Sequence, residues 1–229
     1  MIIRHPAKTR SFQETIVFTH HFGGQSSSTR RHQEFVNQLG FDCVSFNFRY
    51  NEIPWGKFWK RQLLQVLDEV PGDKIIYSFS SPSVATASAI VDEGRKDIKA
   101  WITDGGPFLE AFDCLVNYFR CQTILPRPFQ IFGGAAGYVL MGAFGYEARV
   151  KNWMANFPKE VSILSIRSGQ DKMVPVRAID AFFATDRNLD IEKFELFKAE
   201  HLEGLKNFPA LYKPRVKDFL LKHAHAINT

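Results

Sequence analysis

The sequence predicts an α/β fold, with a mostly parallel central sheet and helices on both of its faces. Two observations predict it. Short apolar runs rich in β-branched and aromatic residues alternate along the chain with segments of helical periodicity. These runs are apolar at nearly every position, which is typical of strands that helices cover on both sides. We therefore expect right-handed crossovers between the strands and a ligand site at the carboxyl ends of the strands.

The first half of the chain contains four predicted strands separated by helices. Glycine, or proline followed by glycine, follows each of these helices and marks its end. The predicted strands cover residues 15–19, 43–48, 74–79 and 98–103. The predicted helices cover residues 30–39 and 58–70 and an Ala-rich segment that ends near residue 93.

The second half resumes the alternation after a long interval. Two further runs of strand character, at 161–166 and 191–197, flank a helix predicted at 176–185. A closing helix is predicted over residues 204–222. The six predicted strands are enough for one doubly covered sheet.

The interval between residues 105 and 158 breaks this pattern. It holds 7 of the 15 glycines, and its segment 128–146 contains no charged residue. Nineteen uncharged residues approach the length of a membrane span. However, one crossing would leave the strands before and after it on opposite sides of a membrane. We therefore expect no membrane span, and a short cap inserted at about 105–158 above the strand ends.

Length and composition agree with an ordinary globular protein. The chain has 229 residues, of which 45% are hydrophobic and 23% charged. We expect a single domain over 1–229, since α/β folds commonly use more than 200 residues around one core. The formal charge is +5, but no basic run is longer than Arg30-Arg31 followed by His32. This pattern predicts no nucleic-acid partner.

The cysteines and the first residues predict the cellular compartment. Cys43, Cys114 and Cys121 cannot all pair within the chain, and their spacing matches no common zinc or redox motif. The segment 1–6 has charge and proline where a secretory signal needs an apolar run. We therefore expect a reducing, cytoplasmic setting.

The loop directly after the third predicted strand contains a candidate nucleophile. In the segment 78–83, Ser80 is flanked two positions away by Ser78 and Pro82, and a nucleophile elbow needs small residues there because its turn is tight. The Ser81 amide at the start of the next helix would then face a developing oxyanion. The same serines could instead cap the helix without any chemistry. Ser81 and Ser83 are alternative nucleophiles inside the helix start.

Two later loops supply the groups that a serine nucleophile requires. Asp171 follows the fifth predicted strand and His201 follows the sixth, and histidine moves protons near pH 7. Asp104, directly after the fourth strand, is the alternative acid. The order Ser80, Asp171, His201 is the order expected of a triad on this fold.

Taken together, these residues resemble the α/β-hydrolase family over nearly the whole chain. The family's Gly-x-x-Asp-x-x-Val-Pro signature is similar to Gly169 through Pro175, with one residue fewer between glycine and aspartate. The segment 20–24 resembles the family's His-Gly-x-Gly-Gly oxyanion loop, which implies that the Phe22 amide is the second oxyanion donor. His21 and Pro82 replace glycines of the family pattern.

The resemblance implies a serine hydrolase with a catalytic triad and an oxyanion hole that cleaves a carboxylic ester or thioester and needs no cofactor or metal. Its partner would be a small-molecule ester or acyl substrate, and the oligomeric state is left open. An apolar cap over the site is consistent with an acyl chain or an aromatic ester as substrate, and mutations at Phe129 or Phe132 would test its influence on chain-length preference. Cap residues that pack on the sheet would give the same composition. His32 is expected on the surface. Two other functions remain: a catalytically lapsed hydrolase that serves as a binding module, and an acyltransferase or C–C hydrolase with the same triad.

Overall fold

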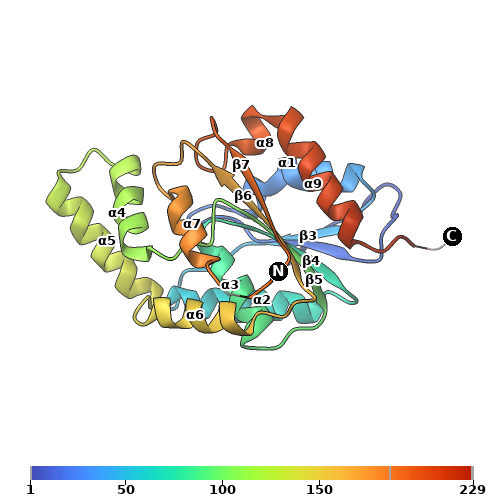
Figure 1. The fold of residues 1–229 in the computed structure, drawn as a ribbon, viewed down its shortest axis with the longest axis horizontal. Helices are drawn as coiled ribbons and strands as arrows, with labels where there is room; N and C mark the ends of the chain where they lie inside the picture. The colour runs from blue at the N-terminus through green and yellow to red at the C-terminus, as the bar shows by residue number, and fades with distance from the viewer. Residues whose placement is uncertain (1, 186, 228–229) are drawn as a thin grey trace.

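A seven-stranded sheet forms the centre of the protein. The computed structural model describes residues 2–185 and 187–227. The strand order is β1-β3-β2-β4-β5-β6-β7, and every neighbouring pair is parallel except β1 with β3. The strands are β1 (Ile2–His5), β2 (Thr15–Phe18), β3 (Cys43–Phe46), β4 (Lys74–Phe79), β5 (Ile98–Asp104), β6 (Ser162–Ser168) and β7 (Ile191–Leu196). The predicted fold class is confirmed (Figure 1).

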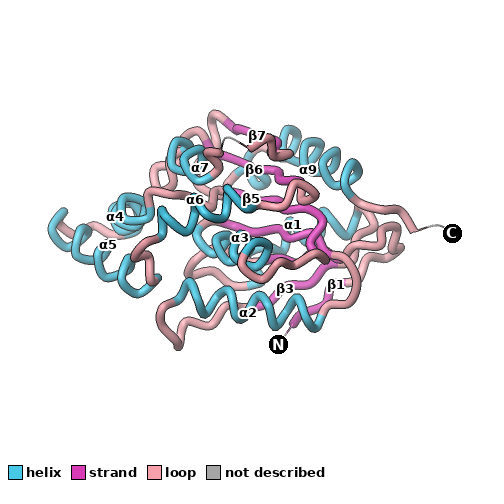
Figure 2. Tube along the Cα trace, turned by 60° about the horizontal axis from the view of Figure 1, so that its bottom comes forward, coloured by secondary structure: helices cyan, strands magenta, loops and turns pink. Residues whose placement is uncertain are grey.

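Helices cover both faces of the sheet, and Figure 2 shows the strands between the two helix layers. One layer contains α2 (Trp55–Glu69), α3 (Val84–Val91), α6 (Tyr146–Asn156) and α7 (Val176–Phe182). The other contains α1 (Arg30–Gln38), α8 (Gly204–Asn207) and α9 (Pro209–His223). A short 3-10 helix, η1 (Ser26–Thr29), leads into α1.

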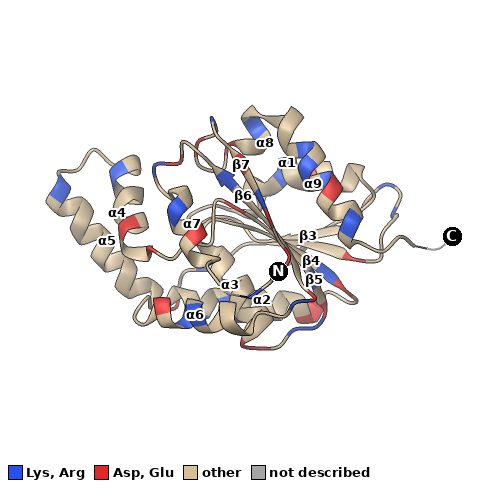
Figure 3. Ribbon diagram, in the orientation of Figure 1, with Lys and Arg blue, Asp and Glu red and all other residues tan. Residues whose placement is uncertain are grey.

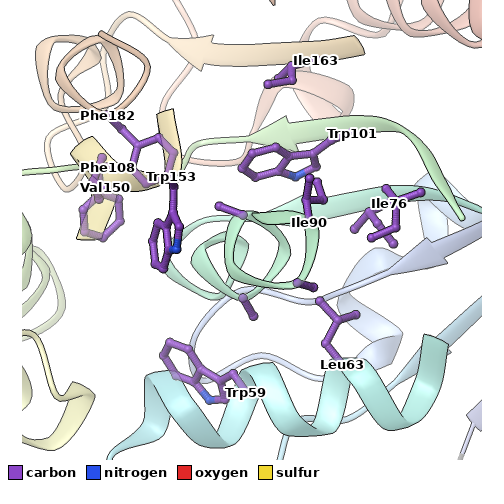
Figure 4. Close-up of a cluster of buried hydrophobic side chains, with 14 of the residues drawn as sticks. Trp59, Leu63, Ile76, Ile90, Trp101, Phe108, Val150, Trp153, Ile163 and Phe182 are labelled. Carbon is purple, nitrogen blue, oxygen red and sulfur yellow. The ribbon is translucent and has the colours of Figure 1, made fainter. Parts of the chain in front are cut away.

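Each layer encloses its own hydrophobic core. Under α2, α3 and α6 the buried side chains include Trp59, Trp101 and Trp153 (Figure 4). Under α1 and α9 the core includes Phe35 and Phe219. Full burial of one such side chain contributes about 1.5–3 kcal/mol. The strands are apolar on both faces because both faces pack against helices.

Two elements differ from the sequence prediction. The strand β1, a short antiparallel edge strand with only two apolar residues, Ile2 and Ile3, was not predicted from the sequence. The single closing helix predicted over 204–222 is two helices separated at Phe208. Pro209 has no amide hydrogen, so the first helix cannot continue through it and a second helix begins there.

The long interval between β5 and β6 contains three helices. The first two, α4 (Ala111–Gln122) and α5 (Arg127–Met141), form an antiparallel pair that extends from one end of the sheet (Figure 1). Gly134 allows the two helices to pack closely, because a Cβ atom at this position would lie only 2.5 Å from Val116 Cγ2. The third helix, α6, packs against α3 on the sheet face. No helix in the described part of the chain is long and apolar enough to cross a membrane.

Candidate active site

The loops that follow β4, β6 and β7 meet at the carboxyl edge of the sheet. Ser80 forms the turn between β4 and the short helix η2 (Ser81–Ser83), with φ 55° and ψ −145°. Such a backbone conformation costs a residue with a side chain about 1–3 kcal/mol. The turn is held from both sides, because the Ser80 amide donates to the Asp104 carbonyl at 2.9 Å and the Ser83 amide donates to the Ser80 carbonyl at 3.1 Å.

Two adjacent glycines allow the loop after β5 to lie against this turn. A Cβ atom at Gly106 would lie 2.5 Å from the Ser80 carbonyl oxygen, and one at Gly105 would lie 3.1 Å from His201 Cε1. Any side chain at Gly106 would therefore push the Ser80 turn out of place. No role was predicted for these glycines, although their position directly after a strand is a signal that could have indicated one.

His201 lies between Ser80 and Asp171. Its Nε2 is 3.2 Å from Ser80 Oγ, and its Nδ1 is hydrogen-bonded to Asp171 Oδ2. An ionised carboxylate only accepts hydrogen bonds, so Nδ1 carries the proton and Nε2 is free to accept the Ser80 hydroxyl hydrogen. The Asp171 side chain is 1% exposed and the His201 side chain 13%. The structure thus brings together the three residues that the sequence analysis selected.

The Asp171 carboxylate is fixed by the backbone that follows it. Its Oδ1 accepts hydrogen bonds from the Met173 amide at 2.9 Å and the Val174 amide at 2.8 Å. Pro175 then caps α7. One oxygen is therefore held by the loop, which leaves the other oriented toward His201.

Gly169 brings the loops after β6 and β7 together. A Cβ atom there would lie 2.7 Å from both Cα and the carbonyl oxygen of Phe197. Two hydrogen bonds join the loops at this point, from the Gly169 amide to the Leu196 carbonyl and from the Gln170 amide to the Ala199 carbonyl, both 2.9 Å long. This close approach allows Asp171 of one loop to reach His201 of the other.

The alternative acid, Asp104, lies in a different set of contacts. Its Oδ2 accepts a hydrogen bond from the Tyr212 hydroxyl at 2.7 Å, and no hydrogen bond joins it to His201 in the described structure. Burial raises the pKa of Asp104 to about 6, although the Tyr212 hydrogen bond acts in the opposite direction. Tyr212 also contacts the Tyr77 hydroxyl and the His32 ring, which completes a buried polar network.

The expectation that His32 lies on the surface was wrong. The residue is only 8% exposed and packs edge-on against Tyr77 and Phe79. Burial lowers its pKa to about 3, so its ring is neutral at physiological pH. The neighbouring Arg30 and Arg31 suggested an exposed segment, but His32 lies on the side of α1 that faces the sheet.

The loop of residues 20–24 is shaped by its first histidine. His20 Nε2 accepts a hydrogen bond from the Phe48 amide at 2.9 Å, and Nδ1 donates to the His21 carbonyl at 2.7 Å. The Gly24 amide closes the turn by donating to the same carbonyl at 3.0 Å. The His21 ring lies over Gly24, where a Cβ atom would be 2.7 Å from it. The turn therefore forms with histidine at the position where the family has glycine.

His21 contributes an uncharged ring to the site. Burial, together with the nearby His20 and His201, lowers the pKa of His21 to about 4. The ring of Phe22 packs among the aromatic side chains of Tyr50 and Tyr118. Aromatic packing thus anchors the loop whose amide was predicted to stabilise an oxyanion.

A cavity of about 400 Å³ opens over Ser80 and His201. Its walls come from the loop of residues 20–24, from α4 and from the end of α5. The lining residues are His21, Phe22, Gly23, Ser80, Ser81, Phe108, Cys114, Leu115, Tyr118, Gln122, Met141, Met173, Val174, His201 and Leu202. Phe129 and Phe132, the cap residues whose mutation would test chain-length preference, do not line this cavity and are 61% and 74% exposed. No cluster of three or more potential metal ligands occurs among the described residues.

Comparison with solved structures identifies the fold. No model of a known protein family and no curated protein matches the sequence. An esterase of Pyrococcus furiosus, Pf2001, superposes with a TM-score of 0.71 at 15% identity, covering 97% of this chain and 92% of that one. A monoacylglycerol lipase of Paleococcus ferrophilus gives 0.71 at 12% identity, covering 97% and 99%. Est1E of Butyrivibrio proteoclasticus, solved with ferulic acid bound, gives 0.70 at 17% identity, covering 97% and 94%. The sheet order, the position of the site at the strand ends and these superpositions together show that the chain has the α/β-hydrolase fold.

Proposed function

We propose that the protein is a serine hydrolase that cleaves a carboxylic ester or thioester through an acyl-enzyme intermediate. One observation carries the proposal: Ser80 occupies a strained turn with its Oγ 3.2 Å from His201 Nε2, while Nδ1 of the same ring is bound to the buried Asp171 carboxylate. A nucleophile, a base and a group that orients the base are the elements of nucleophilic acyl transfer.

The reaction begins at the Ser80 hydroxyl. Its oxygen attacks the substrate carbonyl carbon while His201 Nε2 accepts the hydroxyl proton, and the Asp171 carboxylate stabilises the resulting imidazolium. The tetrahedral intermediate collapses when His201 returns the proton to the leaving alcohol or thiol. Water then attacks the acyl-enzyme with His201 again as the base, which releases the carboxylic acid and restores Ser80.

The oxyanion is proposed to bind to the Phe22 and Ser81 amides. Both residues line the cavity, and in the described structure neither amide donates a hydrogen bond to another protein group. The Ser81 amide also lies at the amino end of η2 and α3, where the helix dipole favours negative charge. The hydrogen bonds of His20 to the Phe48 amide and to the His21 carbonyl would hold the Phe22 amide in place during the reaction.

The surroundings of Ser80 favour an apolar acyl group. A second, smaller pocket of about 70 Å³ adjoins the cavity at Ser81, Phe108 and Met141 and continues between Trp59 and Trp153. The walls of this smaller pocket are mainly apolar and aromatic, and its one charged residue, Arg149, donates hydrogen bonds to the Phe144 and Gly142 carbonyls. The structural neighbours named above include an esterase and a monoacylglycerol lipase, which supports an ester as the substrate class.

The test is hydrolysis of p-nitrophenyl acetate, butyrate and octanoate by the wild type and by Ser80→Ala. We expect turnover by the wild type and a loss of at least about 10³-fold in Ser80→Ala, since the nucleophile is removed. Ser81→Ala keeps its backbone amide and is expected to retain activity. A correctly folded wild type without esterase or thioesterase turnover would contradict the proposal and favour a binding module.

A further inference from the structure

The helical hairpin formed by α4 and α5 carries an unusual apolar surface. Eight of the thirteen large hydrophobic side chains that are exposed in the described structure lie within residues 111–146. The hairpin surface, as we name it, consists of Arg120, Ile124, Leu125, Arg127, Phe129, Ile131, Phe132 and Val139. Ile124 at the tip is fully exposed. Exposed apolar surface concentrated on one element of a soluble protein marks a binding site.

The proposed catalytic site does not account for this surface. The cavity uses the opposite side of the hairpin, through Leu115, Tyr118 and Met141. The small residues of α5, Gly133 and Gly134, face α4 and allow the two helices to pack closely. Each helix therefore has one side occupied, and the outer side of α5 remains without a partner in the described chain.

The charges at the outer end of the hairpin are positive, and the one acidic residue of α4, Asp113, lies in its first turn at the opposite end. No acidic residue occurs between Asp113 and Glu147, whereas Arg120 and Arg127 lie near the hairpin tip. Both arginines are exposed, and neither takes part in an ion pair with any described residue. Figure 3 shows basic residues at the outer end of α4 and α5, an acidic residue at the other end of α4, and a ribbon without charged residues along the rest of α5. Exposed apolar side chains with arginines beside them are the combination that binds anionic lipid headgroups and the acyl chains below them.

A second copy of the same chain fits this surface less well. A twofold interface would place the same patch against itself. Four arginines would then meet without a carboxylate between residues 114 and 146 to pair with them. Like charges brought together in this way oppose association.

We propose that the hairpin surface binds peripherally to an anionic lipid bilayer. The helix axis would lie along the interface, with Ile124, Phe129 and Phe132 among the acyl chains and the two arginines at the phosphates. The helix α5 has 15 residues and is therefore about 22 Å long, too short to cross a hydrocarbon core of about 30 Å. This binding is independent of the proposed hydrolase activity, because it uses no residue of the cavity.

The chain contains a natural position for a reporter of this binding. Cys121, near the hairpin tip, is exposed, whereas Cys43 and Cys114 are buried. Burial raises the pKa of the Cys43 thiol to about 12 and that of the Cys114 thiol further, so neither reacts readily with a maleimide. A polarity-sensitive dye attached to Cys121 would therefore report the environment of the hairpin alone.

The experiment measures dye emission and vesicle co-sedimentation, with vesicles of phosphatidylcholine alone or with phosphatidylserine. We expect a blue shift and binding only with the anionic vesicles, and a loss of binding of more than about tenfold in 0.5 M salt. Arg120→Gln with Arg127→Gln should weaken binding about 30-fold, because each arginine near an anionic surface contributes about 1 kcal/mol, or about fivefold in affinity. Phe129→Ser with Phe132→Ser should weaken it at least about tenfold.

The control changes one exposed apolar and one exposed basic residue on α9, Leu211→Ser with Lys217→Gln, and should bind as the wild type does. The proposal is overturned if folded, labelled protein shows no blue shift with anionic vesicles. It is also overturned if analytical ultracentrifugation shows a dimer that Phe129→Ser with Phe132→Ser disrupts while vesicle binding is absent. Ser80→Ala must bind vesicles normally, so a failure of catalysis and a failure of lipid binding are distinguishable.

Discussion

Asp104 makes the stability of the fold depend on pH, and Asp104→Asn tests this directly. The side chain is 1% exposed and its pKa rises from 3.8 to about 6 on burial. The folded state therefore binds the Asp104 proton more tightly than the unfolded chain does. The resulting stability is fully present below pH 3.8 and is lost as pH rises through about 6.

The size of the effect follows from the two pKa values. One pKa unit corresponds to 1.36 kcal/mol, so the difference between 3.8 and about 6 corresponds to about 3 kcal/mol. About 2 kcal/mol of this is lost between pH 4 and pH 7.5. Asparagine cannot ionise, and its carbonyl oxygen can still accept the Tyr212 hydroxyl hydrogen. We therefore expect the difference in free energy of unfolding between Asp104→Asn and the wild type to shift by about 2 kcal/mol in favour of the variant as the pH rises from about 4 to about 7.5.

The assay is urea unfolding followed by tryptophan fluorescence at several pH values between 4 and 7.5. Only the difference between wild type and variant matters, because all other titrating groups contribute to both. Tyr212→Phe removes the hydrogen bond that lowers the pKa of Asp104, so it should extend the pH dependence to higher pH. Parallel stability curves for wild type and Asp104→Asn would refute the assignment of a buried, proton-binding Asp104.

Three further substitutions test how the site and the hairpin are assembled. Asp171→Asn should lower kcat for p-nitrophenyl butyrate about 10⁴-fold, because the His201 ring loses its orienting acceptor, whereas Asp104→Asn should change kcat less than tenfold; equal losses would contradict the choice of acid. Gly169→Ala places Cβ 2.7 Å from the Phe197 backbone and should cost about 1–3 kcal/mol and reduce kcat, as measured by urea unfolding and steady-state kinetics. The control is Gly72→Ala, which adds a side chain in open space at a left-handed turn; we expect its free energy of unfolding to fall by about 1–2 kcal/mol and its kcat to stay unchanged. A Gly169→Ala variant with full activity would show that the loops after β6 and β7 need not approach so closely. Gly134→Val should separate α4 from α5 and raise protease sensitivity near residue 125, and Val116→Ala should partly restore resistance; unchanged cleavage would argue against close helix packing there.

The sequence predicted the sheet with helices on both faces, and it predicted that site residues follow β4, β6 and β7. Strand periodicity and the residues directly after each strand carried that information. It missed β1 because two apolar residues, Ile2 and Ile3, are too short a run to indicate a strand, and the β1–β3 pairing depends on a distant segment. His32 was misplaced because its burial depends on Tyr77 and Tyr212, which only the fold brings near.

The hairpin shows the same limit. No helix was predicted within this glycine-rich interval, yet Gly133 and Gly134 lie inside α5 and pack against α4. Phe129 and Phe132 were associated with a cap over the substrate, but they are exposed on α5. The composition of a segment does not show which side of its helix faces solvent. Gly105 and Gly106 were overlooked because their role, the close approach to Ser80 and His201, joins residues far apart in the sequence.

The most direct measurement of the central claim is labelling with a fluorophosphonate probe, followed by mass spectrometry of the modified peptide. The probe phosphonylates a serine only when a base has activated it. We predict one adduct per chain, on Ser80, that is absent in Ser80→Ala and strongly slowed in His201→Ala. An unlabelled wild type with intact secondary structure, or an adduct on Ser81 or Ser83, would contradict the account.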